Sequence, residues 1–166
     1  DNLKNRLELL RTGEAQVVIT GQQTGIFGGP MYAVYKLLTC LKVARQTEEL
    51  IDRPVLPIFW LATEDHDFDE INHLIVPTHD FRTRKLAVQA PDSISRSVSR
   101  LAFDQAAVKD IVRQALCTER ETPYTKELLA LSDRLIESST TYGDFFASFL
   151  GELVDHDIIF FDADTE

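Results

Sequence analysis

Cysteine is scarce in this sequence. The 166 residues include only two, Cys40 and Cys117, which lie far apart and form no CxxC pattern. A disulfide-rich scaffold is therefore excluded, and the pattern fits a reduced compartment better than a secreted protein. We expect the protein to be cytoplasmic.

Long hydrophobic runs are also missing. The longest, residues 55–62, has the length of a strand, whereas a membrane-spanning helix needs roughly 20 apolar residues. Residues 1–11 are charged and lack the apolar centre of a signal peptide. We therefore expect no membrane partner.

Basic residues are few. Seventeen Lys and Arg stand against 27 Asp and Glu, which gives a net charge of -10. A protein that binds nucleic acid normally shows a basic face to the phosphates, so we expect no nucleic-acid partner. A nucleotide is still allowed, because a glycine-rich loop and a helix N-terminus can hold phosphate without a lysine.

What the chain does have is the composition of a folded domain, with 44% hydrophobic and 27% charged residues. Residues 16–20 (QVVIT) and 55–61 (VLPIFWL) are typical of buried strands, and the second resembles a parallel strand covered on both faces. Pro57, however, favours an edge strand or a bulge. These two strands and the helix between them predict a βαβ unit.

The helix of this unit follows the loop TGQQTGIFGGP. We expect Gly29 to be its N-cap, Pro30 its first residue, and Glu49 to lie near its end. Cys40 is expected to be a buried thiol on this helix. The positions whose spacing predicts the core-facing side are Met31, Val34, Tyr35, Leu38 and Leu41.

The rest of the chain predicts a return to the same sheet after an insertion. Short strands are expected at residues 73–78, 84–89 and 95–101, then three amphipathic helices, the first capped by Asp104, and a last buried strand at 158–161. The expected fold class is α/β, a parallel sheet core with a small antiparallel and helical insertion. A sheet of about three parallel strands leaves exposed edges that proteins avoid, so we expect the front portion of a longer polypeptide.

The glycine-rich loop is the first candidate site. Gly21, Gly28 and Gly29 allow close backbone approach before a helix N-terminus, which favours an anion such as phosphate. Gln22 and Gln23 add side-chain donors. The pattern is neither G-x-G-x-x-G nor a P-loop, and a tight turn that needs glycine for its geometry is the alternative interpretation.

The second candidate site is the segment TEDHDFDE, at residues 63–70. Its density of carboxylates predicts a compensating divalent cation, a substrate ammonium group or sugar hydroxyls. Because the segment follows a buried strand directly, some of these side chains are expected to begin inside the protein. The alternative is a solvated acidic turn. The side chains concerned are Glu64, Asp65, His66, Asp67, Asp69 and Glu70.

The motifs TGQQTGIFGGPMYAVYK and PVLPIFWLATEDHDFDEINHL, followed by IIFFDAD, resemble the bacillithiol biosynthesis cysteine-adding enzyme family. The resemblance covers the whole chain and is strongest between Val17 and Val76. It implies a Rossmann-like core similar to nucleotidyltransferases and class I aminoacyl-tRNA synthetases. It also implies the division 1–80 for the first half of the core, 81–140 for the insertion and 141–166 for the return to the core.

The resemblance further implies an ATP-linked ligase, with Mg²⁺ as a possible companion of ATP, that joins cysteine to glucosaminyl-malate. The full-length protein would form a homodimer through a C-terminal coiled coil, and the N-terminal portion alone would be inactive. We assign no protein metal ligand. ATP would be held by Gly21, Gln22, Gln23, Gly28, Gly29 and Tyr32, catalysis would rest on Asp65, His66 and Asp67, and substrate would contact Glu64 and Asp69.

Two other functions stay open at this point. The chain could be an isolated Rossmann-like domain that binds a nucleotide or sugar without cysteine ligase activity. A divalent-metal hydrolase built on the acidic segment is the weaker alternative.

Overall fold

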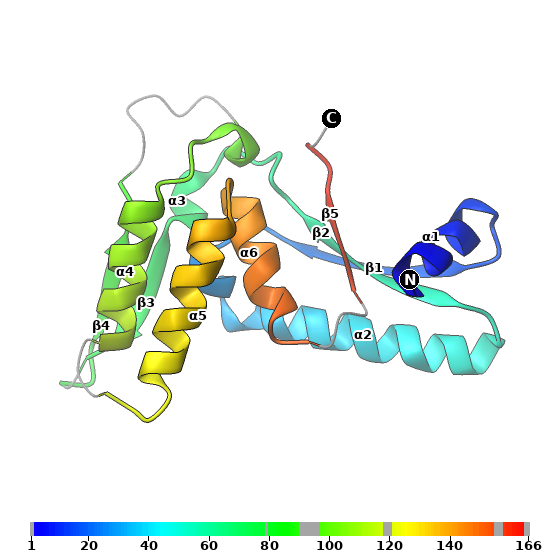
Figure 1. The fold of residues 1–166 in the computed structure, drawn as a ribbon, viewed down its shortest axis with the longest axis horizontal. Helices are drawn as coiled ribbons and strands as arrows, with labels where there is room; N and C mark the ends of the chain where they lie inside the picture. Colours follow the sequence, from blue (N-terminus) through cyan, green and yellow to red (C-terminus); the bar gives the residue numbers. More distant parts are fainter. Residues whose placement is uncertain (1, 79, 90–96, 118–120, 155–157, 165–166) are drawn as a thin grey trace.

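The computed structural model describes residues 2–78, 80–89, 97–117, 121–154 and 158–164. The strands are β1 Gln16–Gln22, β2 Val55–Leu61, β3 His73–Pro77, β4 Thr83–Ala87 and β5 Ile159–Asp162. The helices are α1 Asn2–Arg11, α2 Met31–Ile51, α3 Phe68–Ile71, α4 Gln105–Cys117, α5 Thr125–Ser138 and α6 Tyr142–Gly151, with 3-10 turns η1 Ile26–Gly28 and η2 Val98–Arg100. In Figure 1, β3, β4 and α4 gather at one end of the molecule and α1 lies at the other.

The central sheet has three parallel strands in the order β1-β2-β5. Its register pairs Ile19 with Ile58 and Ile58 with Ile159. The predicted βαβ unit and the predicted final strand are thus confirmed. The expectation that Pro57 marks an edge or a bulge is wrong, since β2 is the central strand. Pro57 fits there because the pairing of β2 with β5 begins only at Ile58.

Helices α2 and α6 pack on the same face of this sheet. The ring of Phe59, on β2, lies 5.9 Å from that of Phe146, on α6, and both side chains are fully buried. Ala33 and Leu37 of helix α2 pack in the same core. The buried residues of the cluster are Ala33, Leu37, Phe59, Leu61, Phe146, Leu150 and Ile158.

The buried side of α2 agrees only in part with the one that the spacing of large apolar residues predicts, since Val34 and Leu41 pack against this core but Leu38 is exposed. Met31 and Tyr35 are 66% and 64% exposed. Small side chains on the buried side let the helix lie close to the sheet, where the thiol of Cys40 reaches the carbonyl oxygen of Val18 at 3.3 Å. Burial raises the pKa of Cys40, as expected for a core thiol. The buried residues of α2 are Ala33, Leu37, Cys40 and Ala44.

The middle of the chain forms a second layer. Strands β3 and β4 pair as an antiparallel hairpin, and α4 packs against α5. The expected strand at 95–101 is wrong in its described part, because residues 98–100 form the turn η2; residues 95 and 96 lie outside the described part. Asp104 caps α4 as predicted, since its Oδ1 accepts the backbone N–H of Ala107 at 2.9 Å.

The insertion and the glycine-rich loop share one apolar core, in which Ile26 of η1 joins side chains from α3, β4, α4, α5 and α6. None of the helices in the described part of the chain is long and apolar enough to cross a membrane. The division at residues 80 and 140 stays a prediction.

Candidate functional site

The two predicted motifs meet at the carboxyl ends of β1 and β2. Gln23, in the loop after β1, donates a hydrogen bond from Nε2 to Oδ2 of Asp65, in the loop after β2, at 2.5 Å. The two residues are 42 positions apart in sequence. Ligands of open α/β sheets bind at this edge, so the contact joins the candidate nucleotide loop to the candidate catalytic loop.

Asp65 is held as a carboxylate. Its Oδ1 accepts the backbone N–H of His66 at 2.6 Å and that of Asp67 at 3.3 Å. The hydrogen bond from Gln23, followed by these two backbone donors, lowers the pKa of Asp65 below its ordinary value. A half-buried, oriented negative charge therefore lies at the sheet edge.

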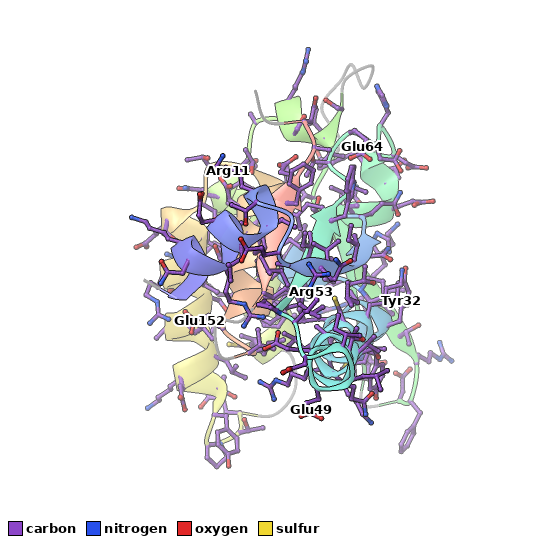
Figure 2. The ribbon with its side chains drawn as sticks, turned by 90° about the vertical axis from the view of Figure 1, so that its right-hand side faces the viewer. Arg11, Tyr32, Glu49, Arg53, Glu64 and Glu152 are labelled. Carbon is purple, nitrogen blue, oxygen red and sulfur yellow. The ribbon has the colours of Figure 1, made fainter. Side chains whose placement is uncertain are left out.

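The other side chains of the acidic segment are more open to solvent. Glu64 accepts a hydrogen bond from Trp60 Nε1 at 3.3 Å, and Asp69 accepts one from Asn72 Nδ2 at 3.3 Å. His66 and Asp67 are exposed. Figure 2 shows Glu64 reaching the surface. The expectation that some of these side chains begin inside holds only for Asp65, which is partly buried, so most of the segment resembles a solvated turn.

The glycines of the loop have two different explanations. At Gly21, near the end of β1, a Cβ atom would lie 2.9 Å from Trp60 Cβ, so packing requires glycine. At Gly28 a Cβ atom would lie 2.8 Å from the ring of Phe149, and a φ of 83° favours glycine as well. Gly29 has room, with neighbours no closer than 3.5 Å, but its φ of 65° and ψ of −154° lie in a region that only glycine adopts readily. Gly29 therefore sets the direction in which the chain enters α2.

Helix α2 begins one residue later than predicted. Pro30 is the N-cap, with extended φ and ψ, and Met31 is the first helical residue. Gly29 does not serve as the N-cap, because its conformation lies outside the extended range of an ordinary N-cap. The N-terminus of a 21-residue helix thus faces the loop, and its first N–H groups lack acceptors within the helix.

Lys36 is a site residue that the sequence analysis missed. Its Nζ lies 3.1 Å from the carbonyl oxygen of Gly21, 2.9 Å from Oε1 of Gln22 and 5.5 Å from the ring centre of Tyr32. Gln22 Nε2 in turn donates to the hydroxyl of Tyr32 at 3.1 Å. The signal that could have found Lys36 is its position four residues after Tyr32, on the same side of the helix.

The carboxylates of Asp162, the last residue of β5, and of Asp164 accept hydrogen bonds from hydroxyl groups of the protein itself. Asp162 accepts a hydrogen bond from the hydroxyl of Thr63, and Asp164 accepts hydrogen bonds from the hydroxyls of Ser99 and Ser97. These donors lower the pKa of Asp164. The network ties β5 and η2 to the end of β2, which is a structural role.

A cavity of about 280 Å³ lies beside the N-terminus of α2. Gly25, Gly29 and Met31 line one side, and Glu70 and His73 line the other together with β3. It offers room for a small ligand next to both motifs. Among the described residues, no three His, Cys, Asp or Glu side chains are grouped so that they could hold a metal ion.

The pKa of Asp65 predicts how acid affects stability. Because the folded-state pKa lies below the unfolded value, ionised Asp65 stabilises the fold above the unfolded pKa, and this contribution is lost as the pH falls through the folded pKa. Gln23→Leu removes the main cause of the shift. Between about pH 6 and about pH 3, the melting temperature of full-length Gln23→Leu should therefore fall less than that of the wild type.

Gln105→Leu is the matched control, because Gln105 Nε2 donates to the carbonyl oxygen of Ser139 at 3.0 Å and touches no carboxylate there. It should lower the melting temperature equally at every pH. Identical pH slopes for the two variants would contradict the role given to Gln23.

Comparison with protein families gives a match over residues 1–166 to the family described as "Bacillithiol biosynthesis BshC, N-terminal Rossmann-like domain". The chain belongs to the BshC family. The Rossmann-like class agrees with the parallel sheet seen here.

Curated BshC proteins are similar along nearly all of the chain. The protein of Exiguobacterium sibiricum named "Putative cysteine ligase BshC" is 95% identical over 166 residues, which is the whole chain and 32% of that protein. Proteins of the same name from Oceanobacillus iheyensis and Geobacillus kaustophilus are 36% and 33% identical over 95% of the chain, and the matched part is 30% and 29% of their length. The chain thus spans about a third of the BshC relatives it matches.

Proposed function

We propose that this chain is the N-terminal part of an ATP-dependent ligase that joins the carboxyl group of cysteine to the amine of glucosaminyl-malate. This amide-forming step would complete bacillithiol. The observation that carries the proposal is the hydrogen bond between Gln23 and Asp65, because it brings a phosphate-type loop and an ionised carboxylate together at one sheet edge. Membership of a family whose relatives bear the name of a cysteine ligase supports it.

The residues around the glycine loop fit the phosphates of a nucleotide. Lys36 supplies a positive charge beside Gly21, and the N-terminus of α2 supplies unpaired N–H groups and a partial positive charge. Gln22 and Tyr32 add polar groups next to Lys36. When bound, ATP would activate the carboxylate of cysteine as an adenylate. Mg²⁺ would be held through phosphate oxygens, as is usual for this ion.

The acidic segment would recognise and deprotonate amines. Asp65, ionised and fixed by Gln23, is placed to pair with a substrate ammonium group. Asp67 and Glu64 would add negative charge nearby, and Asp69 would contact the amino sugar. His66 is exposed next to Asp65 and would accept the proton that the amine loses during attack.

The proposal also concerns where the full-length protein acts and how it assembles. The protein would act in the cytoplasm on small molecules, and the two thirds of the relatives not matched by this chain would supply a coiled coil for a homodimer. This N-terminal part by itself would be inactive, because the nucleotide site would need residues from beyond it.

The experiment is a reconstitution with the full-length protein. ATP, cysteine and glucosaminyl-malate are supplied together and then with each one omitted, and the product is detected by mass spectrometry. We expect bacillithiol, AMP and pyrophosphate only in the complete mixture. ADP and phosphate in place of AMP would overturn the adenylate but keep the ligase. Binding of ATP without any product would favour a domain that binds a nucleotide and performs no ligation.

A further inference from the structure

The turn η2 lies directly against the acidic segment. The backbone N–H of Val98 donates to the carbonyl oxygen of Asp65 at 2.9 Å, and that of Ser99 donates to the carbonyl oxygen of Thr63 at 3.1 Å. The side chain of Val98 is buried in the core that the insertion shares with the glycine-rich loop. Backbone hydrogen bonds and burial therefore fix the position of η2 relative to Asp65.

Asp164, which follows β5, holds the same turn from the other side. Its Oδ2 accepts a hydrogen bond from the hydroxyl of Ser97 at 2.8 Å and another from the hydroxyl of Ser99. The pKa of Asp164 is lowered first by these two hydroxyls and then by the positive charges of Arg100 and His66. Arg100 and His66 therefore lie near Asp164, at the carboxyl ends of β2 and β5.

Arg100 is the last residue of η2, and its side chain is exposed. Its backbone N–H donates to the carbonyl oxygen of Ser97 at 3.0 Å, which completes the turn. Within the described part of the chain, its guanidinium group forms no hydrogen bond and no ion pair. Five N–H donors in a planar fork, a shape that matches a carboxylate, are therefore open to a ligand beside the acidic segment.

The proposed amine substrate carries charges of both signs close together. The amine of glucosaminyl-malate and the link to its malate group are on neighbouring carbons of the sugar, and malate is a dicarboxylate. If Asp65 pairs with the ammonium group, the malate group must lie beside the acidic segment, whose carboxylates repel it. Binding of both ends of this substrate therefore requires a cation next to that segment.

We propose, resting on the ligase function proposed above, that Arg100 binds a carboxylate of the malate group while Asp65 binds the ammonium group. The backbone hydrogen bonds that fix η2 beside Asp65 carry the assignment. In the strand order β1-β2-β5, Lys36 contacts Gly21 on the β1 side, whereas Arg100 is on the β5 side. The two cations thus serve different anions, Lys36 the phosphates of ATP and Arg100 the malate group. Arg100 is then the residue that distinguishes glucosaminyl-malate from a sugar amine without malate.

Calorimetry with the full-length protein tests this role without requiring ligation. The two ligands are glucosaminyl-malate and methyl glucosaminide, which has the same amine but a methyl group in place of malate. Arg100→Gln removes the charge, so we expect it to bind glucosaminyl-malate at least about tenfold more weakly than the wild type does. Its affinity for methyl glucosaminide should be unchanged, and Arg100→Lys should recover part of the loss.

The matched control is Arg53→Gln. Arg53 is an exposed arginine at the opposite end of β2 from Glu64 (Figure 2), and it donates to the carbonyl oxygen of Gly13 at 3.0 Å. This variant should bind both ligands as the wild type does. Unchanged affinity of Arg100→Gln for glucosaminyl-malate would overturn the proposal. An equal loss of affinity for both ligands would overturn it too, because Arg100 would then support the site in general.

Steady-state kinetics tests Arg100 and the ligase separately. In the ligation of cysteine, Arg100→Gln should raise KM for glucosaminyl-malate at least about tenfold and leave kcat within about twofold, because Arg100 contacts no reacting atom. Ligation with an unchanged KM would overturn the role of Arg100 and keep the ligase. Binding that depends on Arg100 but yields no product would overturn the ligase and keep Arg100 as the residue that recognises the dicarboxylate.

Discussion

Full-length protein with Asp65→Asn is expected to lose at least about 100-fold in kcat/KM for the ligation of cysteine. Asparagine keeps the shape of the side chain and can still pair with Gln23, but it removes the negative charge that the hydrogen bonds to Asp65 hold in place. A substrate ammonium group would then lose its charged partner at the sheet edge. Steady-state kinetics with all three substrates measures the effect.

The matched control for this variant is Asp110→Asn. Asp110 also accepts a hydrogen bond from a glutamine side chain, Gln114 Nε2 at 2.8 Å, but on the exposed surface of α4. It should stay within about twofold of the wild type, since exposed surface substitutions are usually mild. If Asp65→Asn kept most of its activity, the acidic segment would be a solvated turn and the proposed roles of its side chains would be wrong.

Gly29→Ala in the full-length protein is expected to weaken ATP binding at least about tenfold, which corresponds to about 1.4 kcal/mol. A Cβ atom at Gly29 meets nothing closer than 3.5 Å, so the cost comes from the backbone conformation, where non-glycine residues are strained by about 1–3 kcal/mol. Relief of that strain turns the loop away from the N-terminus of α2. Calorimetry with ATP measures the loss.

Gly13→Ala provides the control for strain alone. Gly13 also has a positive φ, 78°, and nothing lies within 4 Å of a Cβ atom there, but it is in the turn between α1 and β1, away from the loop. Its variant should be destabilised and bind ATP as the wild type does. If both variants bound ATP as tightly as the wild type, ATP would not bind at the glycine loop and the proposed site would be wrong.

The bounds of a strand could be predicted from the sequence where a short run of neighbouring residues defines them. Residues 55–61 are an apolar run bounded by Pro54 and a polar segment, and β2 has these same bounds. Large apolar residues were only partly informative on α2: Val34 and Leu41 pack against the core, but the helix lies closest to the sheet through small side chains such as Ala33 and Ala44. Hydrophobicity alone does not show which side of α2 packs closely against the sheet.

The site was predictable in its parts but not in its contacts. The glycine loop and the acidic segment stand out by composition, yet only the parallel register of β1 and β2 brings Gln23 to Asp65 across 42 positions. Lys36 has no local signal in the sequence, because it does not follow the last glycine directly as the lysine of a P-loop does. Lys36 Nζ contacts the carbonyl oxygen of Gly21 because α2 packs against β1.

The position of β2 between β1 and β5 also has a consequence for how the chain folds during synthesis. β1, α2 and β2 are complete once residue 61 has left the ribosome, but the contact between Thr63 and Asp162 spans 99 residues. Until α6 and β5 emerge, Phe59 has only α2 to cover it. Pairings this distant in sequence slow folding and leave apolar surface open to aggregation. The nascent N-terminal unit is therefore the stage at which a chaperone would matter most.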